Sequence, residues 1–300
     1  MNEAFAVATH GLSVRYGRET ALHAVDLRVP EGAVYILIGA NGAGKSTAMK
    51  VLLNLVRPGE GSAEVFGLDT ASHGPAVRAQ IGYIPEQHEH DYGWMTGAQL
   101  MRHVAAHYPA WDSEYAAHLV DTLGVRADKK ASTLSKGEAR RLQFVLALAH
   151  RPPLLLLDEP TDGLDPMARN RTLAQLAEHL ADTPTTIVIA THHVHEVESL
   201  ADHVGVLRGG RLVAQMTRDD VRTTVIRYRA EVPEGWRMPA ELRVASARRS
   251  AIGREGEWTL IGDRADVTAR LTAAGATIRD VAPLSLEDAA LAFLAEEEAP

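Results

Sequence analysis

The 300-residue sequence predicts an α/β fold with a mainly parallel sheet, an antiparallel β layer, a helical insert and a small C-terminal α+β appendage. Short, fully apolar runs alternate with segments of helical periodicity, as expected when crossover helices cover both faces of a parallel sheet. After Arg218 the pattern changes to short alternating segments typical of strands. We therefore expect a main domain over residues 1–221, containing a helical subdomain at about 88–150, and a small domain over 222–300.

The individual elements follow from local patterns along the chain. Alternating apolar residues favour strands near the N-terminus, and proline–glycine or double-proline pairs mark where helices end. Strands are predicted over 4–14, 24–29, 34–38, 81–84, 154–157, 185–190, 204–207, 211–214, 224–232, 241–246 and 258–261. Helices are predicted over 45–56, 99–126, 137–150, 166–180, 194–200, 267–274 and 286–295.

The composition excludes several classes of function. Apolar residues make up 46% and charged residues 23%, which is ordinary for a globular protein. The net charge is 31 − 39 = −8 with no basic block, so nucleic acid is not expected as the main partner. The absence of cysteine excludes disulfides, thiol catalysis and cysteine-based zinc sites. No apolar run approaches the roughly 18 residues of a membrane span, and we expect no signal peptide.

A glycine-rich loop follows the apolar run 34–38 and precedes a predicted helix, which is the setting of a phosphate-binding P-loop. Its glycines allow backbone N–H groups to converge on a phosphate chain. Lys45 can reach the β- and γ-phosphates, and Ser46 is placed to ligate Mg²⁺. The alternative is a glycine-rich turn without a ligand. The predicted nucleotide-binding residues are Gly39, Ala40, Asn41, Gly42, Ala43, Gly44, Lys45, Ser46 and Thr47.

Two acidic residues, Asp158 and Glu159, follow the apolar run 154–157. An apolar strand with this ending places carboxylates at the carboxyl edge of the sheet, beside the P-loop. Asp158 is predicted to hold Mg²⁺ through water, and Glu159 to polarise an attacking water. The alternative is a buried strand with an exposed acidic end.

The segment 134–138, Leu-Ser-Lys-Gly-Glu, precedes a long predicted helix, with Ser135 as a suitable N-cap and Glu138 as its capping-box partner. Together with the P-loop and the acidic strand end, this signature segment resembles that of the ATP-binding subunits of ABC transporters, over about residues 5–215. The Ser-Lys-Gly sequence is similar to that of an exporter-like branch. The resemblance implies a P-loop NTPase core of ABC type, in which Ser135 and Gly137 face the γ-phosphate of ATP bound to another subunit. Lys136 and Glu138 replace a glycine and a glutamine of the family pattern.

The resemblance implies roles for three more residues. Tyr16 occupies the place of the aromatic residue that stacks on adenine, whereas a half-buried strand tyrosine is the alternative. His192 matches the switch histidine that contacts the γ-phosphate. Residues 162–165, Asp-Gly-Leu-Asp, resemble the D-loop that links two nucleotide sites, so Asp165 is expected near nucleotide.

One position departs from the family pattern. The family glutamine that senses Mg²⁺ follows a proline like Pro85, but here Glu86 stands in that place and Gln87 comes next. Both residues stay candidates for the sensor. The catalytic set implied by the resemblance is Glu159, His192, Glu86 and Gln87.

The resemblance also implies cofactors and partners. ATP and Mg²⁺ are the expected cofactors, and hydrolysis is expected to reopen a dimer that ATP closes. Identical chains or a homologous second ATP-binding subunit would satisfy this arrangement. A separate transmembrane permease, an exporter, would hold the chain at the cytoplasmic, inner face of the cell membrane. An ABC-type ATPase with a mechanical or regulatory role on a membrane complex is the alternative, and no residue indicates the cargo.

Overall fold

The computed structural model describes residues 4–87, 92–249 and 254–295, within which the chain forms three sheets. The predicted start of the helical subdomain at residue 88 lies outside these ranges. The antiparallel N-terminal sheet contains β1 (Phe5–Tyr16), β2 (Glu19–Val25), β3 (Arg28–Pro30), β5 (Glu60–Val65) and β6 (Leu68–Asp69). The central sheet contains β4 (Val34–Ile38), β7 (Ile81–Ile84), β8 (Leu154–Asp158), β9 (Thr186–Thr191), β10 (His203–Arg208) and β11 (Arg211–Thr217). The C-terminal sheet contains β12 (Val225–Glu231), β13 (Arg243–Arg249), β14 (Glu255–Ile261) and β15 (Thr277–Pro283).

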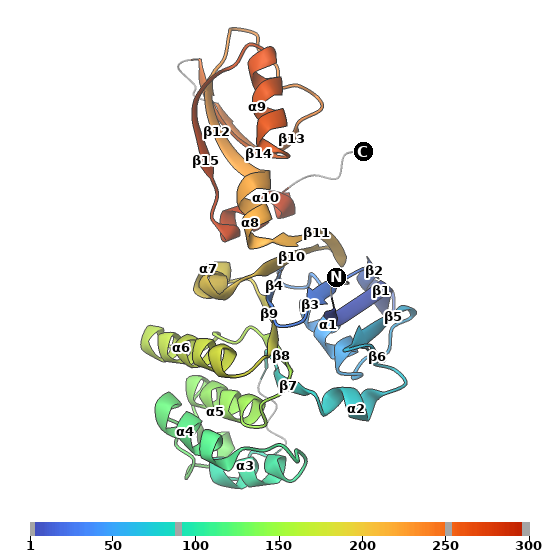
Figure 1. Cartoon of the computed structure of the whole chain (residues 1–300), viewed down its shortest axis with the longest axis vertical. Helices are drawn as coiled ribbons and strands as arrows, with labels where there is room; N and C mark the ends of the chain where they lie inside the picture. The colour runs from blue at the N-terminus through green and yellow to red at the C-terminus, as the bar shows by residue number, and fades with distance from the viewer. Residues whose placement is uncertain (1–3, 88–91, 250–253, 296–300) are drawn as a thin grey trace.

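Helices cover these sheets on several sides (Figure 1). The described helices before β12 are α1 (Lys45–Leu52), α2 (Gly74–Arg78), α3 (Gly97–Ala105), α4 (Ser113–Leu123), α5 (Lys136–Leu148), α6 (Pro166–Asp182), α7 (Val194–Val197) and α8 (Arg218–Thr224). After β12 follow α9 (Arg264–Ala273) and α10 (Leu286–Ala295). Short 3₁₀ turns occur at Ala131–Thr133 and Glu198–Leu200. Within the described ranges, no helix combines the length and the apolar character that crossing a membrane requires.

The central sheet has the strand order β11-β10-β4-β9-β8-β7, with β11 antiparallel and the others parallel. Every residue of β4, β8 and β9 is buried, which explains their nearly continuous apolar sequences. Alternate side chains of β4 enter two different cores, since Ile36 packs with residues of α4, α5 and α6 whereas Leu37 packs with residues of α1 and β1. The predicted α/β architecture with a mainly parallel sheet and an antiparallel layer is confirmed.

Two predicted elements are divided in the structure. The strand expected over 24–29 breaks between β2 and β3, because β2 pairs with the far half of β1 and β3 with its near half. At the break, the side chain of Asp26 accepts a 2.7 Å hydrogen bond from the Gly11 N–H. The helical region expected over 99–126 forms α3 and α4, which are separated by a turn that contains Pro109.

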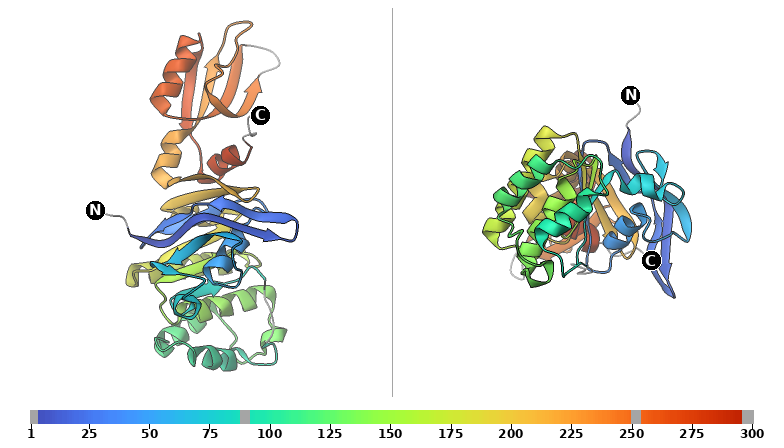
Figure 2. Two further views of the ribbon diagram at one scale, coloured as in Figure 1. Left: turned by 90° about the vertical axis from the view of Figure 1, so that its right-hand side faces the viewer. Right: turned by 90° about the horizontal axis from the view of Figure 1, so that it is seen from below.

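The C-terminal sheet and α9 enclose their own apolar cluster, which includes Tyr228, Trp236 and Trp258. Figure 2 shows this sheet standing apart from the central sheet, with α8 and α10 between them. Helix α10 contributes Phe293 and Ala289 to the core beside the central sheet rather than to the C-terminal cluster. The last helix therefore returns to the main body of the chain.

Candidate nucleotide-binding site

The loop between β4 and α1 curls around the ammonium group of Lys45. Lys45 Nζ donates hydrogen bonds to the carbonyl oxygens of Gly39, at 2.7 Å, and Ala40, at 3.4 Å. Gly44 has φ of 105°, and a Cβ there would lie 2.5 Å from the carbonyl oxygen of Ala21. Only glycine fits this position, which is also the N-cap of α1 and provides no side-chain cap. The first N–H groups of α1 are thus available to an anion.

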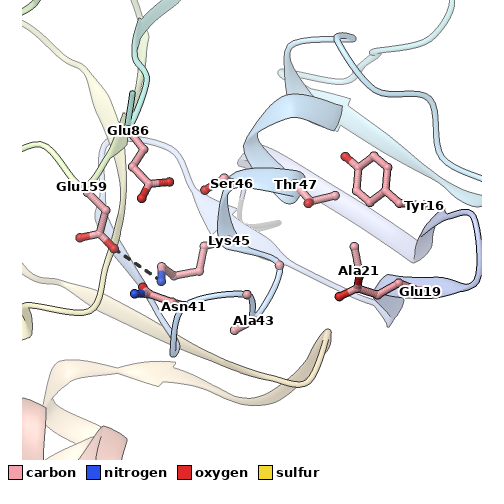
Figure 3. Close-up of a pocket in the computed structure, with 12 residues that line it drawn as sticks. Tyr16, Glu19, Ala21, Asn41, Ala43, Lys45, Ser46, Thr47, Glu86 and Glu159 are labelled. Carbon is pink, nitrogen blue, oxygen red and sulfur yellow. Dashed lines mark ion pairs between the residues drawn. The ribbon is translucent and has the colours of Figure 1, made fainter. Parts of the chain in front are cut away.

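A pocket opens above this loop (Figure 3). Tyr16 and Ala21 lie on one side of it, and Glu86 and Glu159 lie on the opposite side. Tyr16 is 49% exposed and lines the pocket, so its aromatic ring is accessible to a flat ligand there. The remaining lining residues are Glu19, Asn41, Gly42, Ala43, Gly44, Lys45, Ser46 and Thr47.

A second pocket shares Ser46 and Glu86 with the first and is lined in addition by Gln87 and Asp158. Both sensor candidates, Glu86 and Gln87, therefore reach the same region, beside the hydroxyl of Ser46. Asp158, the last residue of β8, is 1% exposed. Its position links the strand end to the P-loop.

The environment of Asp158 suits a divalent cation. Burial raises the pKa of Asp158 to about 6, and the nearby carboxylates of Glu86 and Glu159 act in the same direction, against a hydrogen bond from Ser46. Its buried Oδ1 atom has no hydrogen-bond partner. A buried carboxylate oxygen without a partner, next to a serine hydroxyl, fits Mg²⁺, which is bound in proteins by one or two oxygen side chains together with phosphate and water. The described part of the chain holds no group of three or more His, Asp or Glu side chains that would form a metal cage.

Glu159 is held by hydrogen bonds in a conformation that non-glycine residues rarely adopt. Its φ of 46° lies in the left-handed region, where strain is often kept for function. Its carboxylate accepts a 2.8 Å hydrogen bond from Thr191 Oγ1 and lies 2.8 Å from His192 Nδ1. Lys45 Nζ is 3.5 Å from the same carboxylate. Glu159 and His192 meet because β8 and β9 are parallel neighbours, with Asp158 paired to Ala190.

The signature segment lies elsewhere on the chain. Ser135 caps α5 and forms a capping box with Glu138. The pKa of Glu138 falls to about 2, first because of the hydrogen bond from the Ser135 N–H and then because of Arg126. A Cβ on Gly137 would lie 2.9 Å from the carbonyl oxygen of Gly163, so the signature segment packs closely against the D-loop. Lys136 and Asp162 form a 2.7 Å ion pair across the same contact.

The structure therefore divides the predicted site residues into two groups. P-loop residues 41–47, Tyr16, Glu86 and Glu159 line one pocket, with Asp158 and Gln87 beside it. Asp165 caps α6 by accepting hydrogen bonds from Met167 and Ala168 N–H groups. Gly39, Ala40 and His192 do not line the pocket of Figure 3 but contact Lys45 and Glu159, which do. Ser135, Gly137 and Asp165 line neither pocket.

Two contributors were missed in the sequence. Thr191 donates a hydrogen bond to Glu159, and its place at the end of β9, directly before His192, was a usable signal. Arg140 is fully buried on α5 and donates hydrogen bonds to the carbonyl oxygens of Pro85, at 2.6 Å, and Glu86, at 2.8 Å. No sequence signal distinguishes Arg140 from the neighbouring Arg141.

Known proteins resemble this chain in sequence and in structure. Residues 22–162 match the family described as "ABC transporter". The chain is 34% identical over 270 residues to the daunorubicin/doxorubicin resistance ATP-binding protein DrrA of Streptomyces peucetius, covering 87% of this chain and 81% of that protein. It is 31% identical to the bacitracin transport ATP-binding protein BcrA of Enterococcus faecalis, covering 75% of this chain and 73% of that protein.

Longer coverage is found for the Nod factor export ATP-binding protein I of Burkholderia orbicola (strain AU 1054), which is 32% identical, with 94% of this chain and 95% of that protein aligned. Among solved structures, an ATP-binding subunit of an ABC transporter superposes with a TM-score of 0.66 and 32% identity, covering 72% of this chain and 92% of that chain. The dimeric cassette MJ0796 bound to ADP and Pi has a TM-score of 0.63 at 23% identity, covering 70% of this chain and 98% of that chain, and shares the fold.

Proposed function

The chain belongs to the ATP-binding subunits of the ABC transporter family and is an ATPase, and from this we propose that it powers a separate transmembrane permease as part of an exporter. Two copies of the chain would close over two ATP molecules, and hydrolysis would reopen them. The relatives with printed export or resistance roles differ in cargo, which supports export in general rather than one substrate. The permease would place the chain at the inner face of the cell membrane.

The observation that carries this proposal is the division of the site within one chain. The pocket of Figure 3 contains the P-loop and Glu159 but neither Ser135 nor Gly137. Ser135 begins the 13-residue helix α5, whose N-terminus favours an anion. A two-fold arrangement would bring the signature segment of each copy to the phosphates held by the other.

The chemistry proposed for the closed site follows from the contacts of each residue. Lys45 and the N–H groups of the P-loop hold the phosphates, and Tyr16 stacks on the base. Ser46 and Asp158 would hold Mg²⁺, which when bound neutralises charge that develops on the phosphates. Glu159 accepts the proton of the attacking water.

Contacts around Glu159, and the positions of Glu86 and Gln87, support these roles. Thr191 and His192 keep the Glu159 carboxylate in place, at 2.8 Å each. His192 would also contact the γ-phosphate. Glu86 and Gln87 border the Mg²⁺ position and would report its occupancy to the permease.

The proposed dimer can be tested with Glu159→Gln, which keeps the shape of the side chain but removes the base. We expect this variant to bind MgATP, to hydrolyse it at least about 100-fold more slowly, and to accumulate as a dimer in light scattering. Lys45→Ala is the matched control and should stay monomeric at the same ATP concentration. A Glu159→Gln variant that remains monomeric at saturating MgATP would contradict the shared site, and normal turnover would exclude Glu159 as the base.

The permease can be tested separately. A tagged chain purified from detergent-solubilised membranes of its own source should retain a multi-span membrane protein, identified by mass spectrometry. ATPase activity of that complex should exceed the activity of the chain alone. Purification without any multi-span partner would favour a role outside transport.

A further inference from the structure

The C-terminal helix α10 packs against the short helix α7, which follows His192 in the chain. Val194 and Val197 of α7 share one apolar cluster with Leu286 and Phe293 of α10. All four side chains are at most 4% exposed. Movement of α10 would therefore disturb a closely packed contact two residues from His192.

Polar contacts hold α10 at both of its ends. At its N-terminus, Glu198 Oε1 accepts a 3.0 Å hydrogen bond from the Leu286 N–H. A carboxylate in this place satisfies a free N–H group of the first turn and interacts favourably with the helix dipole. At the other end, Arg208 Nη1 on β10 donates a 3.0 Å hydrogen bond to the carbonyl oxygen of Phe293.

Helix α7 is fixed from its opposite side as well. Glu196, whose side chain is 7% exposed, forms a 2.6 Å ion pair with Arg169 of α6. His195 Nδ1 lies 3.2 Å from Glu287 Oε2 of α10, in a more exposed pair. The segment between His192 and Glu198 is thus held between α6 and α10.

The same segment reaches the catalytic carboxylate. The His193 N–H donates a 2.9 Å hydrogen bond to Thr191 Oγ1, which in turn donates to Glu159. His192 contacts Glu159 through both its backbone N–H, at 3.1 Å, and its ring. A continuous set of contacts therefore runs from α10 through Glu198 and α7 to Glu159.

We propose that Glu198 is a positioning residue. By accepting the hydrogen bond from the Leu286 N–H, Glu198 holds α10 against α7 and so keeps the His192 ring in contact with the Glu159 carboxylate. The rate of hydrolysis would then depend on the docking of the C-terminal helix. This inference rests on the proposed roles of Glu159 and His192. It gives residues after Thr224 a function in hydrolysis, although none of them lines the pocket of Figure 3. Any partner that displaces α10 would slow the chemical step without competing with ATP.

The test compares Glu198→Ala with Glu198→Gln. Alanine removes the acceptor for the Leu286 N–H, whereas the amide oxygen of glutamine retains it. We expect Glu198→Ala to lower kcat about tenfold while ATP affinity stays within about twofold, since misplacing a catalytic group impairs chemistry rather than binding. Glu198→Gln should recover most of the lost rate. Leu291→Ala, on the exposed face of α10, is the matched control and should have normal kcat.

A second variant keeps the test informative if Glu198→Ala does not fold. Glu287→Ala removes only the exposed pair with His195 and should lower kcat about twofold, since exposed pairs are weak. Unchanged kcat in folded Glu198→Ala, an equal loss in Glu198→Gln, or a parallel loss of ATP affinity would each overturn the inference. His192→Ala distinguishes a failure of this inference from a failure of the proposed catalytic site. If it lowers kcat and Glu198→Ala does not, only the inference fails, whereas normal kcat in His192→Ala contradicts the proposed catalytic site itself.

Discussion

Arg140 donates a 2.8 Å hydrogen bond to the main-chain carbonyl oxygen of Glu86, and so joins helix α5 to the loop that lines the pocket beside Ser46 and Asp158. Its guanidinium is fully buried, and burial lowers the pKa of Arg140. The same group also donates to the Pro85 carbonyl. The helix that begins at the signature segment and the loop that carries both sensor candidates are therefore mechanically connected within one chain.

Loss of this connection should be costly. Arg140→Met retains much of the side-chain volume but leaves two carbonyl oxygens without their donor, so we expect the free energy of unfolding to fall by roughly 2–4 kcal/mol. Urea denaturation measures this change. Arg141→Met is the comparison, because Arg141 binds the carbonyl oxygens of Leu123 and Gly124 at the more exposed end of α4. If the free energy of unfolding falls equally in the two variants, Arg140 contributes no more to stability than Arg141.

Removing the P-loop lysine should abolish nucleotide binding. Lys45→Ala deletes the buried charge that lies at the centre of the loop, and calorimetric titration should detect no ATP binding. Lys130→Ala, at an exposed position outside both pockets, should bind ATP within about twofold of the unaltered chain, because only screened charge is lost. Undiminished affinity in Lys45→Ala would refute the P-loop assignment.

The close packing of the signature segment predicts a separate effect on turnover. In Gly137→Ala the added Cβ would meet the Gly163 carbonyl at 2.9 Å and push the D-loop away from α5. We expect a roughly tenfold lower ATPase rate with unchanged ATP affinity of the single chain, since only the shared closed site is misaligned. Lys136→Ala removes the exposed ion pair with Asp162 and should cost less than about threefold. Normal turnover in Gly137→Ala would separate the signature segment from catalysis.

The raised pKa of Asp158 predicts a pH-dependent metal requirement. Since the pKa of Asp158 rises from 3.8 to about 6, the side chain is mostly protonated below pH 6 in the folded chain and ionised above it. Only the ionised carboxylate binds Mg²⁺, so the Mg²⁺ concentration for half-maximal ATPase should be constant above that pH and increase about tenfold per pH unit below it.

Asp158→Asn gives the reference for this measurement, because it shares the titration of ATP itself but lacks the carboxyl group. The Mg²⁺ concentration that this variant needs for half-maximal ATPase should be high at every pH, without the additional increase below pH 6 that Asp158 causes. If both proteins follow the same pH profile, Asp158 is not the titrating ligand.

Much of the fold was predictable because its central strands are buried on both faces. The short apolar runs of β4 and β8, which end at glycine or acidic residues, are typical of strands buried on both faces. By contrast, β5 has the sequence Glu-Gly-Ser-Ala-Glu-Val, with only Ala63 and Val65 buried, and exists because it pairs with β1. Strand β15 has no fully buried residue and likewise depends on its partner β12.

The grouping of the candidate site residues was predictable where a residue type and its neighbours in sequence define a motif, as for the P-loop and Asp158, which lie side by side. Contacts between distant segments were not. The hydrogen bonds from Arg140 to the loop after β7 and from Leu286 to Glu198 join residues more than 50 positions apart. Neither leaves a periodic pattern in the sequence, since each depends on how whole helices pack.

The separation of the apolar clusters has a consequence for folding cooperativity. Val225 lies in the core of the main body, whereas its neighbour Ile226 lies in the C-terminal cluster, so the border between the two passes inside β12 rather than through a linker. Beyond the C-terminal sheet, Leu284 and Leu286 belong again to the main core. Most buried residues of the range 226–283 therefore pack outside the core that α10 helps to form, although Ile261 of β14 belongs to that core. During synthesis this core can be complete only after α10 has been made.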